Sequence, residues 1–171
     1  GSDVYEVTGA GPDWVSGVPY TFQGYDSYTD SGSAADTDSL VATGSAAVDI
    51  GLKSFSTASG IEQIVNATSN GSVVRLLGDW SANTLDFSSV SFVGGNFLLD
   101  GAEGNDTIKG TSLADRIRGG RDADSLDGRD GSDVYEVTGA GPDWVSGVPY
   151  TFQGYDSYTD SGSAADTDSL V

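Results

Sequence analysis

A nine-residue period in residues 101–136 restricts the possible folds of this chain more than any other feature. Cut every nine residues, the segment reads GAEGNDTIK, GTSLADRIR, GGRDADSLD and GRDGSDVYE. The first place is always Gly, the sixth is always Asp, and the eighth is a large apolar residue: Ile108, Ile117, Leu126 and Tyr135. Glycine permits sharp turns, and an isolated apolar residue points inward from a short strand. The period therefore predicts alternating turns and strands, with one Asp at each turn.

These three columns resemble the glycine-rich calcium-binding nonapeptides of the RTX family. The resemblance implies an all-β chain folded as a right-handed parallel β-roll or β-solenoid with calcium-binding turns, in which two nonapeptides complete a coil. Stacked coils then place Asp106 beside Asp124, and Asp115 beside Asp133. A compact β-sandwich carrying a short calcium β-roll is the alternative, because short strands such as those upstream can also pair antiparallel.

Calcium is the expected cofactor, because it takes six to eight oxygen ligands and each turn offers backbone carbonyls beside one carboxylate. Two facing carboxylates about 5 Å apart repel by roughly 3 kcal/mol at an effective dielectric constant near 20, so the cation should fold the segment. The candidate ligands lie mainly at the first, third and sixth places of the repeats. They are Gly101, Glu103, Asn105, Asp106, Gly110, Ser112, Asp115, Gly119, Arg121, Asp122, Asp124, Gly128, Asp130 and Asp133.

Several repeats depart from the family pattern. Thr111 and Arg129 replace Gly in the second place, and Leu113 and Asp122 replace it in the fourth. A left-handed Leu113 would cost roughly 1–2 kcal/mol, so we expect the 110–115 turn to be distorted or to bind calcium less well. Asp enters that region more readily than Leu, so the change at Asp122 is milder. Asp3 lacks a preceding turn, and we expect no complete site there.

A second, longer repeat organises the whole chain. Residues 1–41 recur unchanged at 131–171, which sets a period of 130 residues. Such identity indicates a natural array kept uniform by recombination, or a chain deliberately extended beyond one unit. We divide the unit 1–130 into an aromatic and acidic segment (1–41), irregular solenoid strands (42–100) and the nonapeptides (101–136), with 131–171 starting the next unit. Strands are predicted at 40–44, 46–52, 61–65, 73–77, 83–87, 90–93 and 96–100.

Composition limits the chemistry and the partners. The chain has 26 acidic and seven basic residues, a formal charge of −19, and no Cys, Met or His. Disulfides, thiolate and imidazole chemistry are therefore absent, and we expect a protein that is not an enzyme. The charge disfavours nucleic acid and anionic lipid and favours hard divalent cations. The sequence holds no apolar run of the length that a membrane-spanning helix needs.

The duplicated segment contains two further features with open interpretations. Its aromatic residues could form a stacking surface for sugar, or a loop folded over the solenoid flank; they are Trp14, Tyr20, Phe22, Tyr25 and Tyr28. Its acidic residues could bind another calcium ion or form surface turns; they are Asp26, Asp30, Asp36, Asp38, Asp156, Asp160, Asp166 and Asp168. We expect Trp80 to pack.

Three functions follow from the resemblance and the repeats. The favoured one is a calcium-dependent structural repeat that extends a giant type I-secreted adhesin from the bacterial cell surface, with neighbouring identical repeats as partners. A ligand-binding module that contacts polysaccharide, ice or another cell is the first alternative. The secretion or folding module of an RTX enzyme is the second.

Overall fold

A computed structural model describes residues 1–8, 11–12, 19–30, 36–137, 155–162 and 166–171. The strands are β1 (Val4–Thr8), β2 (Gly11–Pro12), β3 (Pro19–Asp26), β4 (Ser39–Gly44), β5 (Val48–Leu52), β6 (Gln63–Thr68), β7 (Val74–Leu77), β8 (Thr84–Asp86), β9 (Ser91–Val93), β10 (Phe97–Asp100), β11 (Thr107–Lys109), β12 (Arg116–Arg118), β13 (Ser125–Asp127), β14 (Val134–Tyr135), β15 (Ser157–Thr159) and β16 (Ser169–Leu170). A 3₁₀ turn, η1 (Thr57–Ser59), is the one helical element of these residues. None of the described residues forms a helix long and apolar enough to cross a membrane.

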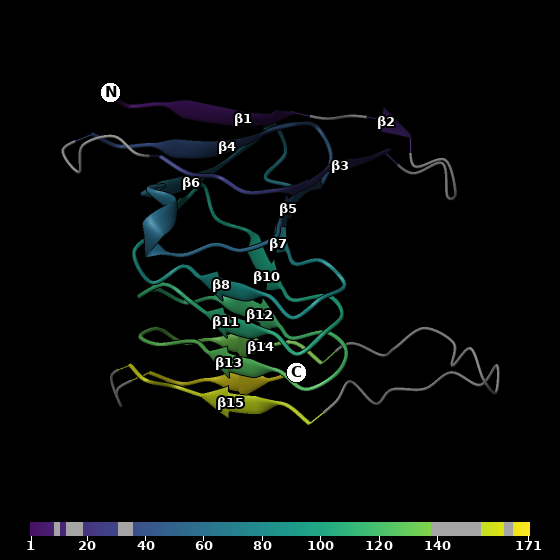
Figure 1. Cartoon of the computed structure of the whole chain (residues 1–171), viewed down its shortest axis with the longest axis vertical. Coiled ribbons are helices and arrows are strands. Elements are labelled where there is room, and N and C mark those ends of the chain that lie inside the picture. Colours follow the sequence, from purple (N-terminus) through teal and green to yellow (C-terminus); the bar gives the residue numbers. More distant parts are fainter. Residues whose placement is uncertain (9–10, 13–18, 31–35, 138–154, 163–165) are drawn as a thin grey trace.

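The strands stack along one axis in three sheets (Figure 1). Their orders are β1-β4-β6-β9, β16-β14-β12-β10-β7-β5-β3-β2 and β15-β13-β11-β8. Among the strands described, every pair is parallel except β2 with β3. Parallel neighbours need a crossover, so the chain winds as successive coils. This confirms the predicted β-solenoid, and the β-sandwich alternative is wrong.

Coil length changes along the axis. In the nonapeptide region Ile108 pairs with Leu126 and Ile117 with Tyr135, so each coil has eighteen residues. Upstream coils are longer: Leu85 pairs with Ile108. The predicted strands between residues 40 and 100 all occur, within a few residues of their expected bounds. These longer coils are the irregular part expected from the sequence.

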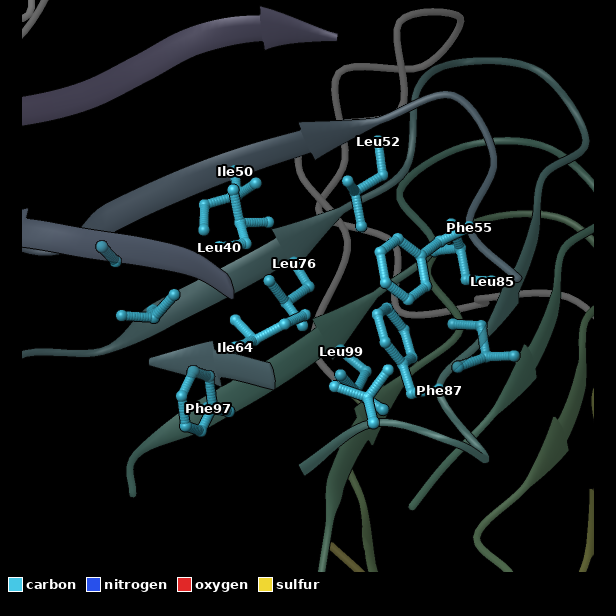
Figure 2. Packing of buried hydrophobic residues seen from close by; sticks show 14 of the residues in the cluster. Leu40, Ile50, Leu52, Phe55, Ile64, Leu76, Leu85, Phe87, Phe97 and Leu99 are labelled. Carbon is cyan, nitrogen blue, oxygen red and sulfur yellow. The ribbon is translucent and has the colours of Figure 1, made fainter. Parts of the chain in front are cut away.

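One apolar core fills the solenoid (Figure 2). The eighth-place residues of all four nonapeptides belong to it and are at most 5% exposed. Nearer the N-terminus, Phe55 and Phe87 stack with ring centroids 5.0 Å apart, and both are fully buried. Each nonapeptide thus contributes one inward residue to this core, and the upstream coils contribute larger aromatic side chains such as Phe55 and Phe87.

The aromatic residues outside the core are only partly as expected. Trp80 lies outside the core: its side chain is 73% exposed. It contacts the Tyr25 ring edge to face, with ring centroids 5.7 Å apart. Tyr28 packs against the core and against Tyr5. Trp14 and the side chains of Tyr20 and Phe22 lie outside the described residues. Of the described residues in this segment, Tyr28 therefore fits the packing interpretation, whereas Tyr25 contacts an exposed aromatic side chain.

Candidate calcium-binding turns

The sixth-place aspartates form two buried ladders along the solenoid. Asp106, Asp115, Asp124 and Asp133 are each at most 5% exposed. The backbone N–H of Asp106 donates to Oδ1 of Asp124 at 2.9 Å, and that of Asp115 donates to Oδ1 of Asp133 at 2.8 Å. The structure therefore brings together both aspartate pairs expected from the eighteen-residue coil.

The second carboxylate oxygen in three of these residues has no partner. Oδ2 of Asp106, Asp124 and Asp133 is buried without a hydrogen bond. Buried polar atoms are nearly always satisfied, and an unpaired buried carboxylate is especially costly. A hard, oxygen-seeking cation would satisfy these oxygens.

Backbone carbonyls lie beside the unpaired oxygens. A Cβ atom placed on Gly101 would lie 2.3 Å from Asp106 Oδ2 and 2.3 Å from the carbonyl oxygen of Gly119 in the next coil. The glycine thus keeps open a small space that faces a carboxylate and a carbonyl from two coils. In the described part of the chain no three acidic side chains converge on one point, so carbonyls must supply much of any coordination shell. This donor set suits calcium.

Three of the four turns share one backbone conformation. Each has positive φ angles at its second and fourth places: Ala102 and Gly104 (80° and 107°), Gly120 and Asp122 (111° and 76°), Arg129 and Gly131 (71° and 119°). Asp122 adopts the left-handed conformation, as its residue type allows. Ala102 and Arg129 also adopt the left-handed conformation, although their residue types disfavour it. The repeat thus imposes its turn even where the glycine is replaced.

The turn at 110–115 is built differently. Neither Thr111 nor Leu113 has a positive φ, and Leu113 is 62% exposed. The Thr111 N–H donates to Asp115 Oδ2 at 2.6 Å, and its hydroxyl lies 3.0 Å from the same oxygen. The Leu113 N–H donates back to the Thr111 hydroxyl at 3.1 Å. The expected distortion is therefore present, but Thr111 satisfies Asp115 in place of a cation, and Leu113 escapes strain.

Burial raises the pKa of every ladder carboxyl. The pKa of Asp106 rises to about 7, and those of Asp115, Asp124 and Asp133 rise to about 6, chiefly because the charged form loses water. The charge of Asp124 adds to the effect at Asp106. Backbone N–H groups that donate to the carboxylates act in the opposite direction. The calcium-free ladder is thus poorly suited to carrying full negative charge.

The other predicted ligands lie at the surface. The side chains of Glu103, Asn105, Ser112 and Asp122 are exposed, and Arg121 and Asp130 are half-buried. Several bridge neighbouring coils: Glu103 pairs with Arg121 at 3.0 Å, and Asn105 accepts the Ala123 N–H at 3.0 Å. Their side chains do not join the buried carboxylates. The first-place glycines Gly101, Gly110, Gly119 and Gly128 do lie against the aspartate of their own turn.

A further turn that stacks on the ladder in the same way, at 78–83, was missed, although neither Asp79 nor Ser81 has a positive φ. The Asn83 N–H donates to Asp106 Oδ1 at 2.8 Å, as Asp106 does to Asp124. A Cβ on Gly78 would lie 2.3 Å from the Gly101 carbonyl and 2.4 Å from Asn83 Oδ1. The signal was the order Gly78, Asn83, Leu85, which matches the first, sixth and eighth places with Asn replacing Asp. An uncharged amide replaces the carboxylate in this turn.

The ladders also continue into the second copy of the 41-residue segment. The Asp124 N–H donates to Asp156 Oδ1 at 3.1 Å, and the Asp133 N–H donates to Asp168 Oδ1 at 3.0 Å. In the first copy the Asp3 N–H donates to Asp38 Oδ1 at 2.5 Å. Asp156 and Asp168 therefore extend the stacking beyond the nonapeptides, and in the first copy Asp3 stacks on Asp38, whose N–H donates to Glu62 Oε2 at 2.8 Å.

Comparison with known proteins agrees with this geometry. Residues 99–135 match the family model of the RTX calcium-binding nonapeptide repeat, in four copies. No curated protein and no solved structure matches the chain. The matched residues contain both aspartate pairs and all four turns with a sixth-place aspartate. Residues 99–135 are thus an RTX repeat region, and their nonapeptides bind calcium ions.

Proposed function

We propose that the chain is a non-catalytic, calcium-dependent extender repeat of a secreted bacterial adhesin, stiffened by calcium outside the cell. The observation that carries the proposal is the buried aspartate ladder with unpaired Oδ2 atoms at Asp106, Asp124 and Asp133. A cation held between coils joins each coil to the next. Stiffness along the axis then depends on calcium.

The tandem repeat supports an extending role. An identical 41-residue segment begins within the last nonapeptide and continues the same sheets through β14 and β16. Weak sites are sufficient outside a cell, where dissociation constants of about 10⁻⁴–10⁻³ M are useful. With calcium at ten times the dissociation constant, each site adds roughly 1.4 kcal/mol of stability. In calcium-poor cytosol this stabilisation is missing, which favours export before folding.

A calcium titration tests the proposal directly. Circular dichroism should show a gain of β structure when calcium is added to the chelated chain. Calorimetry should give a small whole number of ions per chain, set by the nonapeptide turns. An identical spectrum and identical melting temperature with calcium and with chelator would contradict the proposal.

A ligand-binding role is the second candidate, and one observation favours it. Trp80 is 73% exposed and meets Tyr25 edge to face, an arrangement that can stack on a sugar ring. Glycan-array binding that is lost in Trp80→Ala would support this role. Retention of all binding in that variant would remove the Trp80 surface from consideration.

A further inference from the structure

The described parts of the two copies of the 41-residue segment share several internal contacts. β1 pairs with β4 through Val4 and Ser39, and β14 pairs with β16 through the equivalent residues Val134 and Ser169. The stacking bond from Asp3 to Asp38 recurs from Asp133 to Asp168. At these shared positions, a difference in the neighbouring residues reports what the surroundings of each copy add.

The surroundings differ because β1 is an edge strand, whereas β14 lies between β12 and β16. β12 pairs with β14 through Arg116 and Val134 and through Ile117 and Tyr135. Val4 is 67% exposed, but its equivalent Val134 is only half-exposed. The second copy thus shows this segment docked on the nonapeptide coils of a preceding repeat, and the first copy shows it without them.

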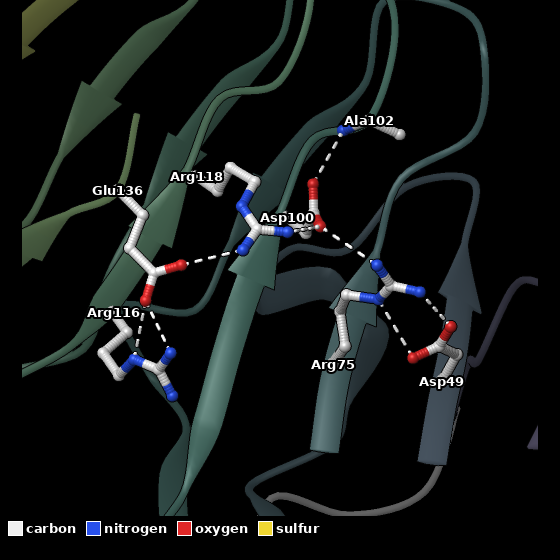
Figure 3. A network of polar contacts seen from close by, with 7 residues as sticks. All are labelled: Asp49, Arg75, Asp100, Ala102, Arg116, Arg118 and Glu136. Carbon is white, nitrogen blue, oxygen red and sulfur yellow. Dashed lines mark hydrogen bonds and ion pairs between the residues drawn. The ribbon is translucent and has the colours of Figure 1, made fainter. Parts of the chain in front are cut away.

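Two arginines of the preceding repeat hold Glu136 of the second copy (Figure 3). Arg116 donates to Glu136 Oε1 from Nε at 2.9 Å and from Nη2 at 2.5 Å. Arg118 donates to Oε2 at 2.8 Å and also bridges to Asp100 at 3.0 Å. The equivalent Glu6 accepts the Thr43 hydroxyl at 3.0 Å, and no basic side chain among the described residues pairs with it.

A tyrosine hydroxyl makes a second link at the same place. The Tyr135 hydroxyl accepts the Gly128 N–H at 2.9 Å and donates to the Thr159 carbonyl at 2.8 Å. It therefore connects the last nonapeptide of one repeat to the coil of the next. The equivalent Tyr5 hydroxyl donates to the Thr29 carbonyl at 3.5 Å. The hydroxyl–carbonyl hydrogen bond within the segment is therefore longer in the first copy than in the second.

We infer that these contacts form the joint between successive repeats: Arg116, Arg118 and Gly128 of one copy hold Glu136 and Tyr135 of the next. The partner of this surface is thus a second copy of the same repeat. A slip of β14 by one residue would turn its side chains to the other face, and a slip by two would move Glu136 away from the guanidinium groups. The pair of arginines, which bind carboxylate in a fixed geometry, therefore sets the register.

The inference rests on the proposed function only in treating the repeats as one continuous solenoid, because Gly128 is the only residue of the joint that is also a predicted calcium ligand. Its test uses the full chain in saturating calcium, with Glu136→Gln and the matched control Glu6→Gln. Amide exchange is followed in peptides that span 125–137, since these begin in unrepeated sequence and cannot be confused with peptides of the first copy. Exchange there should be roughly fivefold to tenfold faster in Glu136→Gln, as expected for loss of a charged hydrogen-bond pair, and unchanged in Glu6→Gln.

A double-mutant cycle locates the effect. Arg116→Gln combined with Glu136→Gln should speed exchange no more than Glu136→Gln alone, because both changes remove the same contact. Tyr135→Phe should also speed exchange at 125–137, whereas Tyr5→Phe should not. Equal exchange in Glu136→Gln and Glu6→Gln would overturn the inference. That outcome is distinct from failure of the proposed function, which would appear as the absence of any calcium response in the unmutated chain.

Discussion

Asp106 and Asp124 lie one coil apart, and the backbone N–H of the first donates to Oδ1 of the second at 2.9 Å. The bond uses one oxygen of Asp124 for stacking and leaves Oδ2 buried without a partner. One side chain thus serves both the backbone and a cation. Changes that affect Oδ1 and changes that affect Oδ2 should therefore have different effects on stability and on calcium binding.

Asp124→Asn should separate these two roles. The amide oxygen can still accept the Asp106 N–H, but the negative charge next to the cation is lost. We expect calcium affinity to fall by on the order of tenfold or more, while the calcium-free chain keeps or gains stability because a buried charge is removed. Calorimetry and urea unfolding in chelator measure the two effects. Asp86→Asn is the control, since Asp86 lies on strand β8 and accepts the Ser88 N–H; a similar loss of affinity there would refute a specific role for Asp124.

Replacing both Thr111 and Leu113 by glycine should convert the 110–115 turn to the conformation of the other three. Asp115 Oδ2 would lose its Thr111 hydroxyl partner and become available to a cation. Calcium binding at this edge should then tighten or gain one ion per chain. Without calcium, the two glycines should cost about 1–2 kcal/mol in unfolding free energy. Calorimetric stoichiometry and chemical unfolding check both parts, and unchanged calcium binding would contradict the assigned role of Thr111.

Acidity should stabilise the calcium-free chain and weaken calcium binding. The folded pKa values, about 7 for Asp106 and about 6 for Asp115, Asp124 and Asp133, exceed the ordinary value of 3.8. The folded state therefore binds protons more tightly than the unfolded chain, and this stabilisation is full below pH 4 and is lost as pH rises through 6–7. Melting temperature in chelator should fall from pH 5 to pH 8.

Calcium should displace the protons that these carboxyl groups retain. At pH 6 to 7 calcium binding should release protons, which calorimetry detects as a dependence of the apparent enthalpy on the buffer's ionisation enthalpy. The release should shrink at pH 8. Proton uptake on calcium binding, or greater stability at pH 8 than at pH 5 in chelator, would contradict the pKa shifts.

Gly101→Ala should damage the calcium site and the stack together. The added methyl group would lie 2.3 Å from Asp106 Oδ2 and from the Gly119 carbonyl, so the coils must separate. A cost of about 1–3 kcal/mol in stability is expected, with weaker calcium binding. Gly95→Ala is the control, because Gly95 has a φ of 70° but open space around its missing side chain. It should cost about 1 kcal/mol through backbone strain and leave calcium affinity unchanged.

The sequence predicted most where side chains repeat at a constant period. The buried eighth-place residues and the aspartate pairs follow directly from coils of eighteen residues, as with Ile108 on Leu126. The upstream strands were also found from their composition. The register between them could not be predicted, because coil length there varies and no fixed column marks it.

Local substitutions account for what the sequence did not reveal. The turn at 78–83 carries Asn83 where the pattern has Asp, so its equivalence appears only when its stacking on Asp106 is seen. Thr111 replaces a glycine, but its hydroxyl supplies a bond that no periodicity describes. Trp80 was expected to pack, as large aromatic side chains usually do, but it is 73% exposed. Its third place in a turn directs it outward instead.

The parallel stacking of coils has a mechanical consequence. Hydrogen bonds between neighbouring coils run along the axis, so a pull on the two ends of the solenoid opens them one coil at a time. An eighteen-residue coil stretched at about 3.4 Å per residue releases roughly 60 Å of chain. Unfolding of one coil thus lengthens the chain, and a calcium ion between two coils raises the force needed to unfold it. Such a rod would lengthen in steps under tension.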